Sequence, residues 1–99
     1  MPRTQGRGFL KYEWDEAKNS ANRVEHRIDF ALVQGFDWDI AQIEIDFRED
    51  YGELREVATS FIGDVLYVLV YTERNKTIRV ISHRKANKKE RRNFGQRAR

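Results

Sequence analysis

Four strand-like segments joined by very short connections constrain the fold of this chain more than any other feature. Polar and apolar residues alternate in 40–47 and 54–62, the run 65–72 is almost wholly apolar, and 77–83 is rich in β-branched residues. The connections are Gly63-Asp64 and the triplet 74–76. Strands joined so closely must pair antiparallel, so the pattern predicts a four-stranded meander in which 65–72 is central and covered on both faces.

The first third of the chain predicts an edge strand followed by two short helices. Residues 9–14 alternate as a short strand. Asp15 is a good N-cap for a helix that ends near His26, and Asp29 is a good N-cap for a second helix over 30–34. Gly35 would end that second helix in the left-handed conformation. The segment is therefore expected to form a helical hairpin.

Side-chain spacing predicts which faces of these elements are buried. On the first helix one face collects small and apolar residues and the neighbouring stripe collects polar ones. The packing face is expected to hold Ala17, Ala21, Val24 and Ile28, and the polar stripe Asp15, Lys18, Asn22 and His26. In the strand 40–47, alternation predicts that Ile43, Ile45 and Phe47 face the core.

Chain length sets the number of domains. A chain of 99 residues buries one hydrophobic core. Helices on one face of an antiparallel sheet make a two-layer α+β domain, whose other face meets solvent, substrate or a partner. We expect a flexible N-terminus over 1–8, a single domain over 9–94, and a basic tail over 95–99 within a C-terminal segment that has helical potential.

Composition excludes several classes of chemistry. The chain has no cysteine, which excludes disulfides, thiolate catalysis and cysteine-ligated zinc. There is no glycine-rich phosphate loop and no nucleophile elbow, so no cofactor is predicted. Two scattered histidines give too weak a pattern to predict a metal site. The absence of a long apolar run favours a soluble, cytoplasmic protein without a membrane partner.

Positive charge is concentrated at the C-terminal end. Residues 83–99 carry a net charge of +7, whereas residues 1–82 carry −4. Such a basic segment indicates contact with nucleic acid or an acidic partner, although a solvated tail that only confers solubility is the commoner case. The cations available for contact with a nucleic-acid backbone are Lys18 in the first helix and, near the C-terminus, Lys85, Lys88, Lys89, Arg91 and Arg92.

The candidate catalytic residues are a group of arginines with a serine, a glutamate and both histidines: Arg55, Arg79, Arg84, Ser82, Glu53, His26 and His83. Metal-independent RNA cleavage requires neutralisation of a phosphorane, and arginine suits this because it stays charged and offers forked donors. Histidine or glutamate could transfer the protons.

Simple structural roles compete with these assignments. Arg55 and Arg79 could pair with Glu53, Glu56 or Glu73 across the sheet, and His26 could cap its helix. Strict alternation also puts Arg79 and His83 on one face of the last strand and Ser82 and Arg84 on the other. The four can share a site only if the strand ends or bulges near Ser82.

Several motifs together resemble the BrnT toxins of bacterial type II toxin–antitoxin pairs. They are Y-E-W-D-E-A-K-N-S-A-N-R-V-E-H at 12–26, Y-G-E-L-R at 51–55, Gly63, V-Y-T at 70–72 and I-R-V-I-S-H-R-K-A-N-K-K-E-R at 78–91. The resemblance implies a RelE-like fold and a ribonuclease that blocks translation by cutting mRNA, with or without the ribosome. It also implies a BrnA-type antitoxin, a toxin–antitoxin heterotetramer, and contact with operator DNA only through that complex.

The residues that match the family motifs, and that the resemblance assigns to the site, are Lys18, Asn22, His26, Glu53, Arg55, Arg79, Ser82, Arg84 and Glu90. Two positions depart from the family pattern. Arg27 stands where the family commonly has glycine, which predicts a different turn between the helices. His83 stands where a small residue is usual, and could add a proton-transfer group or alter the site.

Two hypotheses of different classes remain. The first is a metal-independent endoribonuclease toxin. The second is a non-catalytic module that binds nucleic acid or an acidic partner through its basic C-terminal segment. The position of the charge separates them, because a binding module needs only the tail, whereas a nuclease also needs cations within the sheet, such as Arg55 and Arg79.

Overall fold

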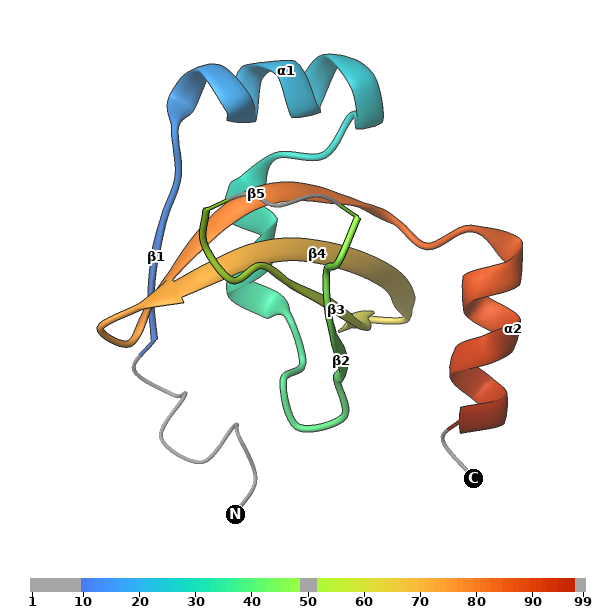
Figure 1. Cartoon of the computed structure of the whole chain (residues 1–99). Helices are drawn as coiled ribbons and strands as arrows, with labels where there is room; N and C mark the ends of the chain where they lie inside the picture. The colour runs from blue at the N-terminus through green and yellow to red at the C-terminus, as the bar shows by residue number, and fades with distance from the viewer. Residues whose placement is uncertain (1–9, 49–51, 98–99) are drawn as a thin grey trace.

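The structure, a computed structural model, describes residues 10–48 and 52–97 (Figure 1). The predicted flexible N-terminus over 1–8 lies outside these residues. The elements are, in chain order, β1 (Lys11–Glu13), α1 (Glu16–His26), the 3-10 helix η2 (Phe30–Gly35), β2 (Gln42–Ile45), β3 (Glu56–Ile62), β4 (Val65–Arg74), β5 (Thr77–Lys85) and α2 (Lys88–Arg97).

One five-stranded sheet forms the body of the fold, with strand order β1-β5-β4-β3-β2. Strands β2 to β5 pair antiparallel in sequence order, which confirms the predicted meander. Strand β1 lies at the edge, as predicted, and pairs parallel to β5. Strand β4 is central, and residues 66–72 are all buried. The α+β class is confirmed.

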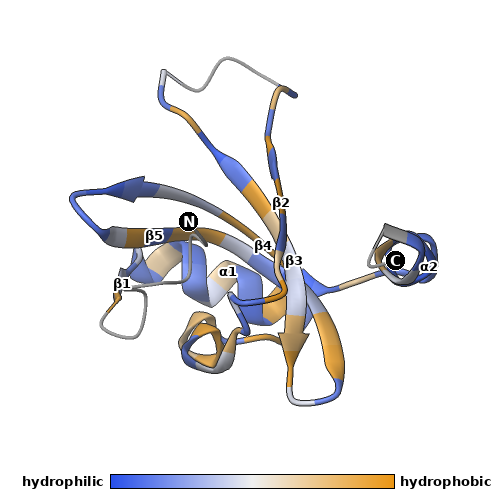
Figure 2. Cartoon of the chain, turned by 90° about the horizontal axis from the view of Figure 1, so that it is seen from below, coloured by the Kyte–Doolittle hydropathy of each residue, from blue (hydrophilic) through white to orange (hydrophobic). Residues whose placement is uncertain are grey.

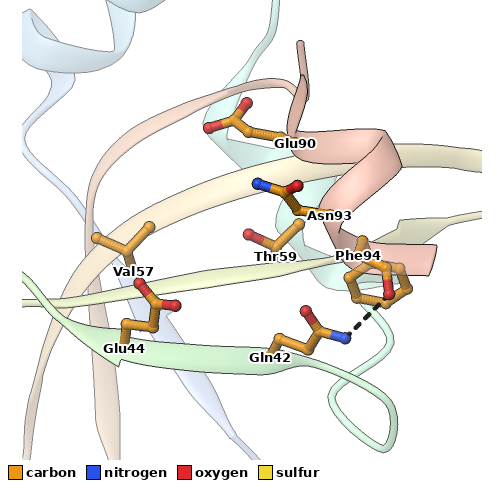
Figure 3. Close-up of a pocket in the computed structure, with 7 residues that line it drawn as sticks. All are labelled: Gln42, Glu44, Val57, Thr59, Glu90, Asn93 and Phe94. Carbon is orange, nitrogen blue, oxygen red and sulfur yellow. Dashed lines mark hydrogen bonds between the residues drawn. The ribbon is translucent and has the colours of Figure 1, made fainter. Parts of the chain in front are cut away.

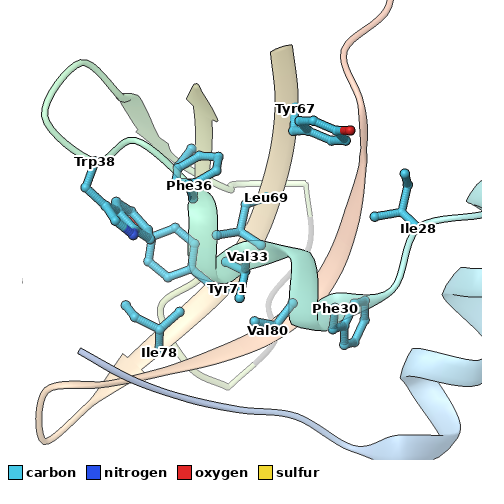
Figure 4. Close-up of a cluster of buried hydrophobic side chains, with 11 residues drawn as sticks. Ile28, Phe30, Val33, Phe36, Trp38, Tyr67, Leu69, Tyr71, Ile78 and Val80 are labelled. Atoms are coloured by element: carbon cyan, nitrogen blue, oxygen red, sulfur yellow. The ribbon is translucent and has the colours of Figure 1, made fainter. Parts of the chain in front are cut away.

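Helix α1 and η2 cover one face of the sheet, called here the helix-covered face. Phe30 and Val33 of η2 are fully buried in a cluster with Leu69, Tyr71 and Val80 of the sheet (Figure 4). The loop after η2 contributes further aromatic rings to the same cluster. Its Trp38 donates a hydrogen bond of 2.8 Å to the Tyr12 hydroxyl, which ties β1 to this core. The apolar core thus fixes the position of the sheet edge where β1 and β5 meet.

The predicted packing face of α1 is wrong. Val24 is 85% exposed, and Ala17 and Ala21 are also exposed, so of that set only Ile28 is buried. The buried residues of α1 are Asn19 and Asn22. The reason is that α1 packs against backbone groups, which require hydrogen-bonding partners more than apolar contact.

Asn22 joins α1 to β5 through backbone hydrogen bonds. Its side-chain amide donates to the carbonyl oxygens of Ile28 (2.8 Å) and His83 (2.7 Å), and its side-chain oxygen accepts from the His83 N–H (3.2 Å). Strand β1 pairs with β5 only as far as Arg79, so among the described residues the edge of β5 beyond that point has no neighbouring strand. Asn22 therefore supplies at His83 the two bonds that another strand would have made.

Two α1 variants test this description. We expect Asn22→Ala to lower the free energy of unfolding by about 2–4 kcal/mol, because it leaves buried backbone groups without partners. Val24→Ala in the same helix should change it by less than about 0.5 kcal/mol, because the side chain is exposed. Urea unfolding measures both values. A larger loss for Val24→Ala than for Asn22→Ala would contradict the burial described here.

The turn between α1 and η2 uses Arg27 in the left-handed conformation, with φ of 61°. Its N–H donates to the Arg23 carbonyl at 2.9 Å and so ends the helix. Glycine adopts this conformation at lower cost, which explains why glycine suits this position. Gly35, in contrast, is not left-handed, and that prediction is wrong. It lies where a Cβ would approach the Ile62 side chain to 3.1 Å, so close packing accounts for it.

Strand β5 contains an irregularity near Ser82, the position where a shared site requires one. Val70 of β4 pairs with Ser82, whereas the adjacent Tyr71 pairs with Val80. Ile81 is therefore an extra residue, a β-bulge. Side chains that follow Ile81 face the opposite side of the sheet from the one that strict alternation predicts.

The C-terminal segment is helical, and α2 continues to Arg97, through the predicted domain boundary between 94 and 95. Asn87 and Glu90 exchange backbone and side-chain hydrogen bonds of 2.8 Å at its start, which is a capping box. Phe94 packs edge-to-face on Phe61, with ring centroids 5.6 Å apart. Figure 2 shows α2 as a largely hydrophilic helix set beside the sheet. It therefore covers only one end of the sheet face that lies opposite η2.

Neither α-helix within the described part of the chain has the length and apolar character needed to cross a membrane. Within the same residues, no three or more acidic, histidine or cysteine side chains are grouped so that they could hold a metal ion.

Candidate active site

The bulge at Ile81 places three of the predicted site residues on one face of the sheet. Val68, Val70 and Thr72 alternate along β4 and so share a face, and their partners in β5 are Arg84, Ser82 and Arg79. This face lies opposite η2 and is called here the cleft face. The sequence left open whether a bulge near Ser82 brings Arg79 and Arg84 to the same face, and the register shows that both lie on the cleft face.

A cleft of about 580 Å³ is open on this face. Its floor is formed by valines of β3 and β4, and its walls combine charged and polar side chains with Ile45 and Phe47. The residues that line it are Glu44, Ile45, Asp46, Phe47, Arg48, Val57, Val68, Val70, Ser82 and Arg84. The site thus combines an apolar floor with two guanidinium groups and two carboxylates.

A smaller pocket of about 180 Å³ adjoins the cleft beneath α2 (Figure 3). Glu44 and Val57 line both cavities, so the two are neighbours. The smaller pocket is closed by Glu90 and Phe94 of α2, and the Gln42 side chain donates to the Phe94 carbonyl at 3.3 Å. Its lining has two carboxylates and no cation, whereas the lining of the larger cleft includes Arg48 and Arg84, so the larger cleft is the candidate site for a phosphate.

Arg84 is held at the edge of the cleft by Glu90. Two hydrogen bonds of 2.8 and 2.9 Å join the guanidinium to the carboxylate in a forked pair. These bonds hold the pKa of the Glu90 carboxyl below its usual range and raise the pKa of Arg84, while the charge of Arg48 opposes that rise. Arg84 therefore carries a fixed positive charge, and its partner Glu90 anchors α2 beside the cleft.

A groove of about 280 Å³ lies on the other side of β5, between that strand and α1. Of the predicted polar stripe of α1, Lys18, Asn22 and His26 line it, whereas Asp15 does not. The remaining lining includes Ile81 and Ser82. Ser82 lines both cavities, so the groove and the cleft meet at this residue.

The model of one family, "Ribonuclease toxin, BrnT, of type II toxin-antitoxin system", matches residues 14–90 of the chain. The chain belongs to the BrnT family. The crystal structure of the ribonuclease toxin BrnT from Brucella abortus has the same fold, with a TM-score of 0.63 and 23% sequence identity over 80% of this chain and 99% of that chain. No curated protein sequence gives a match. The recognition made from the motifs is therefore confirmed.

Arg79 and Glu53 take part in ion pairs outside the cleft lining. Arg79 donates to Glu13 of β1 at 2.6 Å, a partner that the sequence reading did not consider. Glu53 accepts from Arg74 at 2.8 Å. Arg79 is still partly exposed on the cleft face, whereas the Glu53 carboxylate is paired with Arg74 at the end of β4.

Arg55 precedes β3 and is half-buried. Its carbonyl accepts a hydrogen bond of 2.8 Å from the N–H of Asp46, which lines the cleft. The structure thus puts Arg55 next to the cleft wall through its backbone, while its side chain is not among the lining groups.

His83 does not reach the cleft or the groove in this BrnT-family chain, which corrects its assignment as a proton-transfer group. It pairs with Leu69 on the helix-covered face and is fully buried, with its ring 5.3 Å from that of Tyr67. Neither ring nitrogen has a hydrogen-bond partner among the described residues. Burial lowers the pKa of His83 from 6.5 to about 4, so the ring is neutral at pH 7. The bulge is the physical reason, because it directs His83 inward.

The basic residues of the C-terminal segment are exposed and lie in or just before α2: Lys85, Lys88, Lys89, Arg91 and Arg92. Arg91 also donates to the Ala86 carbonyl at 3.0 Å, which secures the junction of β5 and α2. Their exposure leaves them accessible to a polyanion at the end of the sheet beside Arg84.

Sequence reasoning missed Asp46 and Arg48. Strand β2 ends at Ile45, so Ile45 and Phe47 are 44% and 83% exposed and Asp46 is buried, the reverse of the predicted alternation. Arg48 makes a forked pair with Asp46, with bonds of 2.9 and 2.8 Å. The only signal in the sequence was the spacing D-F-R, which allows such a local pair but occurs in many loops.

The buried His83 predicts a pH dependence of stability. Because the pKa of His83 is lower in the folded chain, the unfolded chain binds a proton at a pH where the folded chain does not. Stability that is present at pH 7 is therefore lost as pH falls from 6.5 toward 4. We expect the free energy of unfolding to fall by about 2 kcal/mol between pH 7 and pH 5 because of this residue.

His83→Leu should remove that loss, while leaving the acid titration of the carboxylates unchanged. Urea unfolding of both proteins at the two pH values gives the comparison. Equal losses in the wild type and in His83→Leu would show that His83 is not responsible.

Proposed function

We propose that this BrnT-family ribonuclease toxin cleaves RNA without a metal ion, using the cleft, the groove and the strand β5 that separates them. The observation that supports this most directly is the bulge at Ile81, which puts Arg79, Ser82 and Arg84 on one face. A chain that served only as a binding module would need basic residues on its surface, but not cations gathered beside a hydroxyl within the sheet.

In this proposal the arginines stabilise the charge that develops on the phosphate. Arg84 and Arg79 are permanently charged and lie on the cleft face, and Arg55 adjoins the cleft wall. The apolar floor of valines lowers the local dielectric, which strengthens their attraction for a phosphorane. Ser82, where the cavities meet, would donate a hydrogen bond to a phosphate oxygen.

His26 is our proposed proton-transfer residue. Of the three candidates, His83 is buried in the core and Glu53 is paired with Arg74. The His26 side chain is 28% exposed and lines the groove with Ser82. It could therefore accept the proton of a ribose 2′-hydroxyl whose phosphate lies at Ser82. Lys18 in the same groove and the basic residues of α2 would bind neighbouring phosphates.

The remaining parts of the proposal rest on family membership. The toxin would act in the cytoplasm on mRNA, on or off the ribosome, and so inhibit translation. A BrnA-type antitoxin would neutralise it within a heterotetramer, and operator DNA would be contacted only through that complex.

Arg79 has both a structural and a catalytic explanation, and a pair of variants separates them. Wild-type protein should cleave RNA in the presence of EDTA, and Arg79→Ala should reduce the rate about 100-fold, as the loss of one charge-stabilising donor does elsewhere. Glu13→Gln breaks the same ion pair but retains the cation, so its cleavage rate should stay close to that of the wild type. Equal defects in the two variants would make Arg79 a structural residue only.

His26→Gln should lower the cleavage rate by about 100-fold or more, because proton transfer by a positioned histidine contributes that much. The pH–rate profile should also lose the limb that reports the ionisation of a histidine. The measurement is RNA cleavage over a series of pH values. A slower enzyme with an unchanged profile would exclude His26 as the proton-transfer group.

A further inference from the structure

The second arginine of the cleft, Arg48, belongs to no motif discussed above. It follows β2 and lines the cleft together with Arg84 of β5, so the two cations come from strands that β4 and β3 separate in the sheet. Its side chain is 70% exposed, which leaves it accessible to a ligand. A flexible surface arginine would have the same exposure, so its orientation decides whether it could form part of a site.

Asp46 gives Arg48 a defined orientation. The Asp46 side chain is only 2% exposed, and it accepts three hydrogen bonds from Arg48: from the backbone N–H (3.1 Å), from Nε (2.9 Å) and from Nη2 (2.8 Å). The backbone N–H of Asp46 in turn donates to the Arg55 carbonyl. Because the carboxylate is buried and the Asp46 backbone is bonded to the residue before β3, the planar guanidinium is held in place before any ligand arrives.

Arg48 and Arg84 are near enough to repel one another. The charge of Arg48 lowers the pKa of Arg84, opposing the rise caused by Glu90. Each arginine is bound on one side by its own carboxylate, Asp46 or Glu90, through a forked pair. Two oriented cations that repel each other across an open cleft are stabilised when an anion enters between them. The remaining carboxylate of the cleft, Glu44, disfavours highly charged anions and so favours a singly charged phosphodiester over a terminal phosphate.

We propose that Arg48, oriented by Asp46, binds a backbone phosphate of RNA in the cleft together with Arg84. This phosphate is adjacent, along the RNA, to the phosphate that binds at Ser82. The RNA strand therefore passes from the cleft over Ser82 to the groove lined by Lys18 and His26. Arg48 acts here as a binding residue, and the inference rests on the proposed ribonuclease function for the identity of the ligand.

The test uses an RNA oligonucleotide with 2′-O-methyl riboses, which lacks the attacking hydroxyl and therefore reports binding without cleavage. The dissociation constant of the full chain is measured over a series of salt concentrations. Arg48→Gln should weaken binding about 10-fold and reduce the slope of log K against log salt by about 0.7, the value for one lost phosphate contact on a single strand. Lys76→Gln removes the same charge at the distant β4–β5 turn and should leave the slope unchanged.

Arg48→Lys is the control for a folding defect in Arg48→Gln, because lysine still supplies a cation to Asp46. It should keep the salt slope and weaken binding several-fold, since a lysine lacks the planar fork. The inference would be overturned if Arg48→Gln and Lys76→Gln reduced the slope equally, or if Arg48→Gln bound with full affinity. Wild-type protein that binds the oligonucleotide but leaves ordinary RNA intact would instead overturn the proposed function, so the two failures are distinguishable.

Discussion

The candidate site depends on one extra residue in β5. In a regular strand, successive side chains face opposite sides of the sheet, so an insertion reverses the facing of everything after it. Ile81 is that insertion, and the residues beyond it are Ser82, His83 and Arg84. Without it, Ser82 and Arg84 would lie on the face opposite Arg79. The bulge therefore makes a shared site from residues that strict alternation would separate.

The same reversal also buries a polar side chain in the core. His83 is directed into the core, where its ring has no hydrogen-bond partner among the described residues and its pKa is depressed to about 4. Its backbone is bound by Asn22, which closes the open edge of β5. The helix that carries Asn22 also carries Lys18 and His26, so the contact that stabilises the bulged strand also positions the groove.

Carboxylates hold the cations of the cleft face. Glu13 binds Arg79, Glu90 binds Arg84 and Asp46 binds Arg48. Partners of this kind reduce the mutual repulsion of the arginines and fix their geometry, which suits a site that must receive an anion without rearranging. Glu90 has the further effect of anchoring α2, so that the basic helix stays beside the cleft.

The sequence by itself determined the four strands of the meander and their antiparallel order, the helix caps at Asp15 and Asp29, and the family, because periodicity, turn residues and motifs act locally along the chain. It also indicated that a bulge was needed near Ser82. The buried face of α1, the inward position of His83 and the Asp46–Arg48 pair were decided only by the tertiary structure. Each depends on what lies across from the residue: a strand edge without a neighbour, a core of aromatic rings, or a carboxylate buried where β2 ends. Such partners are distant in sequence or set by where a strand stops, and residue patterns do not encode them.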